Sequence, residues 1–159
     1  MRSATKAGQE WLEREFDAVR FMAEWAACNG YPGFTWRIAL ELSTCVDRVL
    51  PWREAVEFYA LALEAARTER EPIGEAYLLN ALGCLHLVKD ERLMAASYFE
   101  QAFTCFRQQN HAAGQELLHA NLALVHAELG DADRADQHSR QASGRAYPAD
   151  GEVWGRIGA

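Results

Sequence analysis

The chain has 159 residues, of which 50% are hydrophobic and 25% are charged, so it has enough apolar side chains for one folded domain and is not a disordered chain. Its 16 basic and 23 acidic residues give a formal net charge of −7 with no Lys/Arg cluster, which argues against direct binding of nucleic acid or of an anionic membrane. Acidic residues near the start and the short uncharged runs predict a cytoplasmic protein without a signal peptide or a membrane span.

Apolar residues recur at helical spacing almost throughout the chain, and no alternating stretch indicates a strand. Clusters of Gly, Pro, Asn and Asp interrupt this pattern and mark the ends of helices. The sequence therefore predicts an all-α fold of about seven helices. In chain order they cover residues 4–29, 34–49, 52–69, 73–88, 91–108, 111–129 and 132–146.

The first third of the chain is rich in aromatic residues, which we expect in the core at the first helix interfaces rather than in a cofactor site. If another domain precedes this chain, exposed members of the set would form the interface with it. The set comprises Trp11, Phe16, Phe21, Trp25, Phe34, Trp36, Trp52 and Phe58.

The helices after residue 30 repeat with a period of 40. The aligned sets are Leu42, Leu82 and Leu122; Ser43, Gly83 and Ala123; Ala55, Ala95 and Ala135; Tyr59, Phe99 and Ser139; and Ala62, Ala102 and Ala142. The small second set indicates a close crossing of antiparallel helices, and a serine in the aromatic set is typical of a degenerate terminal repeat. This pattern predicts a packing helix in residues 1–30, three 40-residue helical-hairpin repeats in 31–146 and a tail in 147–159. An unrelated helical bundle is the alternative.

The middle repeat reads Leu82-Gly83-x-x-His86 and then Ala95-x-x-x-Phe99-x-x-Ala102. It resembles the tetratricopeptide-repeat signature, with His86 in place of the usual tyrosine and a period of 40 in place of about 34. The resemblance implies a right-handed solenoid of helical hairpins.

Two segments also resemble the repeat arrays at the carboxyl end of large bacterial regulators, the actinobacterial antibiotic-regulatory and MalT-like families. One is Ile73-Gly74-Glu75-Ala76, and the other is Trp11-Leu12-Glu13-Arg14-Glu15-Phe16-Asp17-Ala18-Val19, which is similar to the helix that opens those arrays. The resemblance covers about residues 9 to 146 and implies a protein-interaction or ligand-sensing module associated with transcriptional regulation. Because the sequence has no P-loop and no basic recognition helix, it would supply only the sensing or partner-binding part of such a regulator.

No set of residues predicts catalysis or metal binding. His86 and His126 occupy the same repeat position, and Cys84 lies two residues from His86, a spacing that places the two side chains on different faces of a helix. We expect both histidines to pack in the tyrosine slot, and no motif pairs a nucleophile with a base. The sequence predicts neither an enzyme nor a bound metal or cofactor. The remaining histidines, expected at the surface or rim, are His111, His119 and His138, and the cysteines, expected as reduced thiols, are Cys28, Cys45, Cys84 and Cys105.

The first helix of each repeat is expected to line the concave face of the solenoid. Counting from the aligned leucines places a mostly apolar set there: Leu40, Thr44, Asp47, Asn80, Cys84, Leu87, Ala120, Leu124 and Ala127. Without basic side chains to hold a terminal carboxylate, this partner-binding groove fits an amphipathic helix or a partly apolar segment of a protein or peptide. Two alternatives stay open. The first helix of the chain or a second copy, in a homodimer, covers the groove, or the groove forms the pocket of a small helical enzyme or small-molecule binder.

The tail from Tyr147 to Ala159 contains Pro148 and three glycines and is not expected to continue the last helix. Its apolar residues include Trp154, which we expect to pack against the end of the solenoid or in the concave groove, in this chain or a neighbouring one.

Overall fold

The computed structural model describes residues 6–142 as an array of eight α-helices, with no strand in that range. The helices are α1 (Lys6–Cys28), α2 (Pro32–Glu41), α3 (Ser43–Val49), α4 (Trp52–Glu69), α5 (Pro72–Val88), α6 (Arg92–Gln108), α7 (Ala112–Glu128) and α8 (Ala132–Ser139). The all-α prediction is confirmed. None of the described helices is long and apolar enough to cross a membrane. The predicted tail, residues 147–159, lies outside the described residues.

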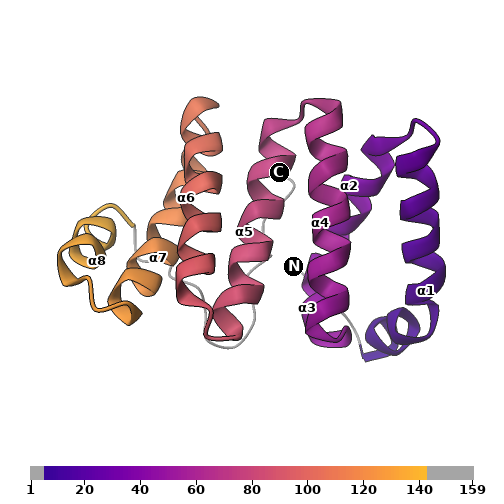
Figure 1. Ribbon diagram of the computed structural model, residues 1–159, viewed down its shortest axis with the longest axis horizontal. Helices are drawn as coiled ribbons and strands as arrows, with labels where there is room; N and C mark the ends of the chain where they lie inside the picture. The colour runs from indigo at the N-terminus through magenta and orange to yellow at the C-terminus, as the bar shows by residue number, and fades with distance from the viewer. Residues whose placement is uncertain (1–5, 143–159) are drawn as a thin grey trace.

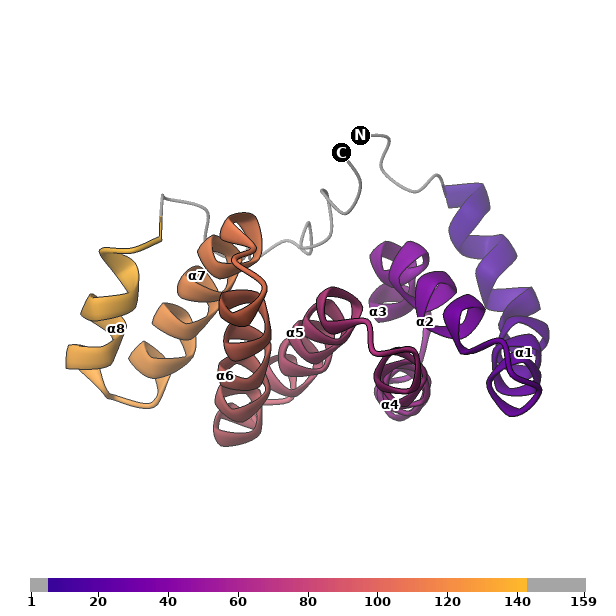
Figure 2. The same cartoon turned by 90° about the horizontal axis from the view of Figure 1, so that it is seen from above.

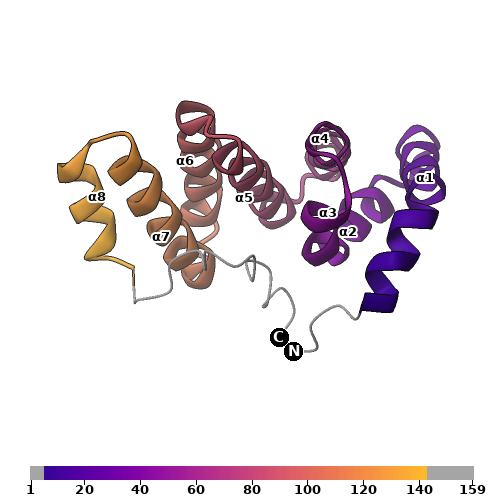
Figure 3. The same ribbon diagram turned by 90° about the horizontal axis from the view of Figure 1, so that it is seen from below.

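The helices stand side by side in chain order, and the array is longer than it is wide (Figure 1). Seen from above, α4 and α6 lie toward one side of the array and α2, α3 and α7 toward the other, with α5 between them (Figure 2). The view from below shows the same two sides (Figure 3). Helices pack as consecutive pairs, α2 with α4, α5 with α6 and α7 with α8, as in a solenoid of helical hairpins.

Five turns between helices share one backbone form. The φ angle is positive, between 52° and 84°, at Gly30, Arg70, Asp90, Asn110 and Gly130. At each turn the next residue donates its N–H to the carbonyl five residues before it, which closes the last turn of the preceding helix. The turn before α4 differs because Pro51 has no N–H to donate. From Arg70 to Gly130 successive turns are 20 residues apart, so two helices make up each 40-residue unit.

The residues that recur in the sequence form the core. Ala55, Ala62, Ala95 and Ala102 are fully buried, as are the rings of Tyr59 and Phe99. A β-carbon added to Gly83 would lie 2.5 Å from the ring of Phe99, so α5 and α6 approach closely at the small position. In the last pair Ala135 is buried. Ser139, which replaces the aromatic residue of the other pairs, is exposed.

The structure corrects two predicted helices. The helix predicted over 34–49 begins at Pro32 and is interrupted at Leu42, between α2 and α3. The Ser43 hydroxyl donates to the carbonyl oxygen of Leu40 at 2.6 Å, a local bond that competes with the regular helical ladder. The last helix, predicted to reach residue 146, ends at Ser139. Because Ala135 is its one buried residue, α8 has little packing to extend it.

Helix α1 exposes an aromatic surface on its outer side. One side of α1 packs on α2, α3 and α4 through the core residues Leu12, Phe16, Val19 and Ala23. On the other side and on the adjoining start of α2, Trp11, Phe21, Trp25 and Phe34 are exposed by 47% to 66%, so the prediction that these four are core residues is wrong. They are exposed because α1 ends the array, and within the described residues no further helix packs on it. Phe16 and Phe58 are buried as predicted.

Candidate functional site

The residues predicted to line the groove lie on α2, α3, α5 and α7, and many of them are enclosed. Leu40, Asn80, Cys84 and Ala120 are buried, with at most 8% of each residue exposed. They are enclosed because α2 contacts α5 and α5 contacts α7. The accessible members are Leu87 and Leu124, which are half-buried, and Ala127, which is exposed. Thr44 and Asp47 lie on α3.

Two buried asparagines join successive first helices at the centre of this set. The Nδ2 atom of Asn121, on α7, donates to Oδ1 of Asn80, on α5, at 2.7 Å. Both residues are 0% exposed. Sequence reasoning selected Asn80 but missed Asn121, because the repeat register aligns Asn80 with Ala120. The signal that could have identified Asn121 is that an asparagine directly follows Ala120, the residue aligned with Asn80.

The asparagine pair keeps unused hydrogen-bonding capacity. Among the described residues, Nδ2 of Asn80 and Oδ1 of Asn121 have no hydrogen-bond partner. Exchanging oxygen and nitrogen in both amides reverses the bond and again leaves one donor and one acceptor free. A buried polar group without a partner costs about 1 to 3 kcal/mol. Because both asparagines are 0% exposed, a further molecule could bond these atoms only after the side chains that cover them move apart.

The half-buried leucines lie on the same helix faces as the asparagines, further along α5 and α7. Leu87 follows Asn80 by seven residues and Leu124 follows Asn121 by three, spacings that keep side chains on one face of a helix. A ligand that reaches the two amides therefore also meets apolar surface from Leu87 and Leu124. The pair and these two leucines together are called the asparagine site below.

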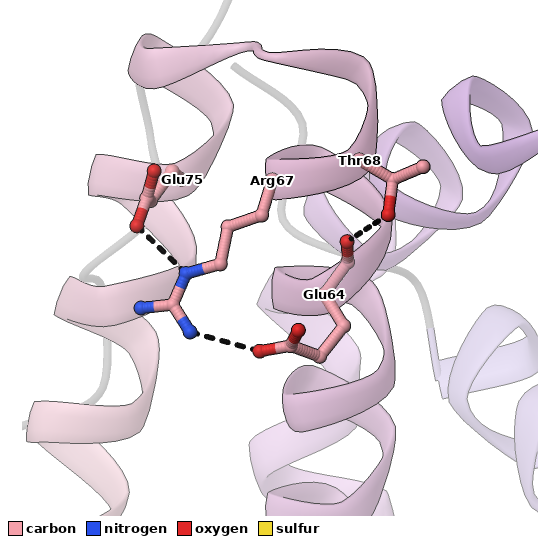
Figure 4. A network of polar contacts seen from close by, with 4 residues as sticks. All are labelled: Glu64, Arg67, Thr68 and Glu75. Atoms are coloured by element: carbon pink, nitrogen blue, oxygen red, sulfur yellow. Dashed lines mark hydrogen bonds and ion pairs between the residues drawn. The ribbon is translucent and has the colours of Figure 1, made fainter.

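A separate hollow of about 390 Å³ lies where α4, α5 and α6 meet. Its wall includes Leu63 and Arg67 of α4, Leu79 of α5, and Met94 and Tyr98 of α6. The Arg67 guanidinium is already occupied there, since it donates to Glu75 of α5 and to Glu64 of its own helix, each at 2.8 Å (Figure 4). The hollow is thus a recess of mixed polar and apolar lining, whose cation is already paired with two carboxylates.

The ion pair between Arg67 and Glu75 is expected to add little to stability, because the Arg67 side chain is 41% exposed and solvent screens the attraction. A double-mutant cycle of Arg67→Met and Glu75→Gln, followed by urea denaturation, should give a coupling of no more than about 1 kcal/mol, smaller still in high salt. A coupling above about 2 kcal/mol that salt leaves unchanged would contradict this picture of a screened surface pair.

The histidines take part in packing and hydrogen bonding within the helical array, and the sequence predicted some of these roles. His86 and His126 are buried, at 7% and 4% exposure, which agrees with packing in the tyrosine slot. His86 bonds Glu91 through Nδ1 at 2.5 Å. His111 caps α7, with its Nδ1 atom accepting from the backbone N–H of Gly114 at 3.0 Å. His119, which was expected at the surface or rim, is half-buried and packs edge-on against Phe103 at 4.7 Å between ring centroids.

The titratable groups of the described part of the chain do not form a metal centre. No group of three or more His, Cys, Asp or Glu side chains there is arranged to hold a metal ion. None of the four cysteines forms a disulfide. Burial raises the pKa of the Cys105 thiol, which keeps it protonated and poorly nucleophilic at neutral pH.

Comparison with known proteins identifies the fold. No family model matches the chain, and no curated protein matches it. Among solved structures, the crystal structure of the TPR domain of Arabidopsis FLU is similar, with a TM-score of 0.64 at 18% identity over 70% of this chain and 93% of that one. The fold is a right-handed tetratricopeptide-like solenoid. In this tetratricopeptide-like fold, α2 with α3, α5 and α7 are the first helices of the hairpins, and the asparagine site joins two of them.

Proposed function

We propose that the chain is a protein-interaction module that binds an extended, partly apolar segment of a partner protein at the asparagine site. The supporting observation is the pair of unused amide atoms on Asn80 and Asn121. Both residues are 0% exposed, so the proposal requires α5 and α7 to separate locally when the segment binds. One free donor and one free acceptor are the complement of a single peptide unit, which presents one C=O and one N–H. An extended segment has both groups free, whereas a helix uses them internally, so the asparagine site favours an extended segment over an amphipathic helix.

The apolar part of the asparagine site would supply the rest of the binding energy. Leu87 and Leu124 are half-buried and offer contact to apolar side chains of the segment. No Arg or Lys belongs to the site, so a carboxylate at the end of the segment is not required. The buried amides would then set the register of the segment, while the leucines provide affinity.

We place this module in transcriptional regulation as a finer proposal. It rests on the sequence resemblance of about residues 9 to 146 to the repeat arrays of actinobacterial antibiotic-regulatory and MalT-like regulators. In this proposal residues 31–146 act as three binding repeats and residues 1–30 as a packing helix. The exposed aromatic surface of α1 and the start of α2, formed by Trp11, Phe21, Trp25 and Phe34, is then a surface that a neighbouring domain of a regulator could cover.

A second candidate function is binding of a small molecule in the hollow between α4, α5 and α6. Its volume of about 390 Å³ is within the size range of ligand pockets. This hollow is bounded by α4, α5 and α6, and it shares no lining residue with the asparagine site. A thermal-shift screen of metabolites separates the two functions, because a ligand in the hollow should stabilise a variant with a blocked recess, Leu63→Trp, less than the wild type.

The proposed function is tested with peptides selected from a random phage-displayed library on the immobilised chain. A selected peptide should bind the double variant Asn80→Leu/Asn121→Leu at least tenfold more weakly, equivalent to about 1.4 kcal/mol, when measured by fluorescence anisotropy. The double variant should melt close to the wild type, because replacing both partners of a buried hydrogen bond by apolar groups of similar shape is nearly neutral.

The matched control is Leu93→Ala, since Leu93 is 76% exposed and lies on α6, a helix that contributes no residue to the asparagine site. The control should bind the selected peptides as the wild type does. Equal binding of the peptides to the wild type and to the double asparagine variant would contradict the proposal. Failure of the library to yield any peptide would also count against it.

A further inference from the structure

Three histidines of the last two helices gather beside Phe103 of α6. The Nδ1 atoms of His119 on α7 and His138 on α8 are 2.9 Å apart. The ring of His138 also stacks on that of His126, with centroids 5.8 Å apart and an angle of 7° between the planes. Phe103 meets the rings of His119 and His138 edge-on. Through these contacts α8 is joined to both α6 and α7.

The contact between His119 and His138 depends on their protonation. A neutral imidazole has one N–H and one bare nitrogen, so in a hydrogen-bonded pair one ring donates and the other accepts. When both rings are protonated, both Nδ1 atoms carry hydrogen and no acceptor remains. Two positive charges then face each other at hydrogen-bond distance, and His126 adds a third titratable ring within 5.8 Å of His138.

We propose that the His119–His138 pair is a pH-sensitive latch, which holds α8 on α7 at neutral pH and releases it in mild acid. This latch is independent of the asparagine site and of the function proposed for it. Release of α8 would uncover the side of α7 that packs on α8 at neutral pH. This end of the array would then present a different surface in mild acid, and the change would be reversible.

The electrostatic surroundings favour the neutral pair. Burial lowers the pKa of His119, and burial together with the charges of His119 and His126 lowers the pKa of His138. On α6, Glu100 opposes this effect and raises the pKa of His138, while Arg134 on α8 lowers it further. The Glu100 side chain is 57% exposed, so solvent weakens its attraction for a protonated ring.

The direction of the pH effect follows from these lowered pKa values. Between the ordinary histidine pKa of about 6.5 and the lowered values, the released state binds more protons than the docked state. The stability supplied by the neutral pair is therefore complete above about pH 6.5 and is lost as the pH falls through the lowered values. Each unit by which a pKa is lowered changes the docking equilibrium about tenfold.

Helix α8 is the element that such a change can release. It has eight residues, and Ala135 is its one buried residue. Ser139 is exposed at the position where the other repeats bury Tyr59 and Phe99. With so little apolar packing, the contacts of His138 make up a large share of what holds α8, whereas the other hairpins have fully buried aromatic rings.

The latch is tested by hydrogen exchange of the intact chain, corrected for the intrinsic pH dependence of exchange. Protection of the amides of α8 should fall about tenfold or more between about pH 7.5 and about pH 5.5, while that of α5 should stay unchanged. His119→Phe keeps an aromatic ring against Phe103 and removes the titrating partner, so it should lose most of the pH-dependent fall. His111→Asn, which can still accept from Gly114, is the control and should behave as the wild type.

A second measurement covers the case in which His119→Phe docks α8 poorly at every pH. Proton NMR titration of the histidine rings in the wild type should place the pKa of His119 and of His138 below the ordinary value of about 6.5. The latch is overturned if α8 protection does not change with pH, if His119→Phe retains the full fall while α8 stays docked, or if both rings titrate at the ordinary value.

Discussion

Phe106→Ala is expected to lower the free energy of unfolding by about 3 to 5 kcal/mol, the usual cost of removing a buried phenylalanine ring. Phe106 is 0% exposed at the end of α6 and connects the middle and last repeats. Its ring lies 4.9 Å from that of Tyr77 on α5 and 5.1 Å from that of His111, which caps α7. A β-carbon on Gly114 would lie 2.5 Å from the ring, so α7 also approaches it closely. Removal of the ring would therefore leave a cavity where α5, α6 and α7 meet.

This loss is measured by urea denaturation followed by circular dichroism at 222 nm, with Leu93→Ala as the control on the same helix. Leu93 is 76% exposed, so its truncation should change the free energy of unfolding by no more than about 0.5 kcal/mol. If the two variants lose similar amounts, Phe106 does not hold the packing role assigned to it.

Gly83→Leu is expected to cost about 1 to 3 kcal/mol, because a side chain at this position enters space that the ring of Phe99 already fills. A β-carbon at Gly83 alone would lie 2.5 Å from that ring, and Phe99 is fully buried and has no room to move aside. Ala113→Leu is the control, since Ala113 is exposed in the first turn of α7. Urea titrations of both variants measure the difference.

A compensating change separates overpacking from a general effect of leucine at Gly83. Gly83→Ala in a Phe99→Leu background removes ring atoms from the position that the new methyl group needs. The double variant should be more stable than the sum of the two single changes predicts, with a favourable coupling of about 0.5 to 3 kcal/mol. Additive losses, or a Gly83→Leu variant as stable as Ala113→Leu, would contradict the close crossing of α5 and α6 at Gly83.

Most of the fold follows from residues whose effect is local or periodic. The period of 40 identifies Gly83 as a recurring small position, which the structure places against Phe99, and it places the buried alanines Ala55 and Ala95 at equivalent positions. Gly30 and Gly130 mark turns because glycine adopts a positive φ angle readily. Asp90 and Asn110 adopt the same conformation, which Asn and Asp reach more readily than other residues with a side chain, whereas for Arg70 only the regular spacing of the breaks indicates it.

The parts of the molecule that sequence reasoning misplaced depend on which helices become neighbours. Helical periodicity identifies an apolar face but does not say how much of it a neighbour covers, so Leu40 and Cys84 were expected in an open groove and are enclosed. The same limit applies to Trp11 and Trp25, whose side of α1 has no further described helix against it.

The sequence by itself therefore determined the all-α class, the hairpin spacing and the small crossing positions, because each depends on residues that repeat along one chain. Only the tertiary structure decided the contacts that carry the proposals. The Asn80–Asn121 pair joins residues 41 apart, and the His119–His138 pair joins residues 19 apart across two helices. Neither pair follows the repeat register, because such contacts depend on the rotation of one helix against the next, which is set by how the side chains between them pack.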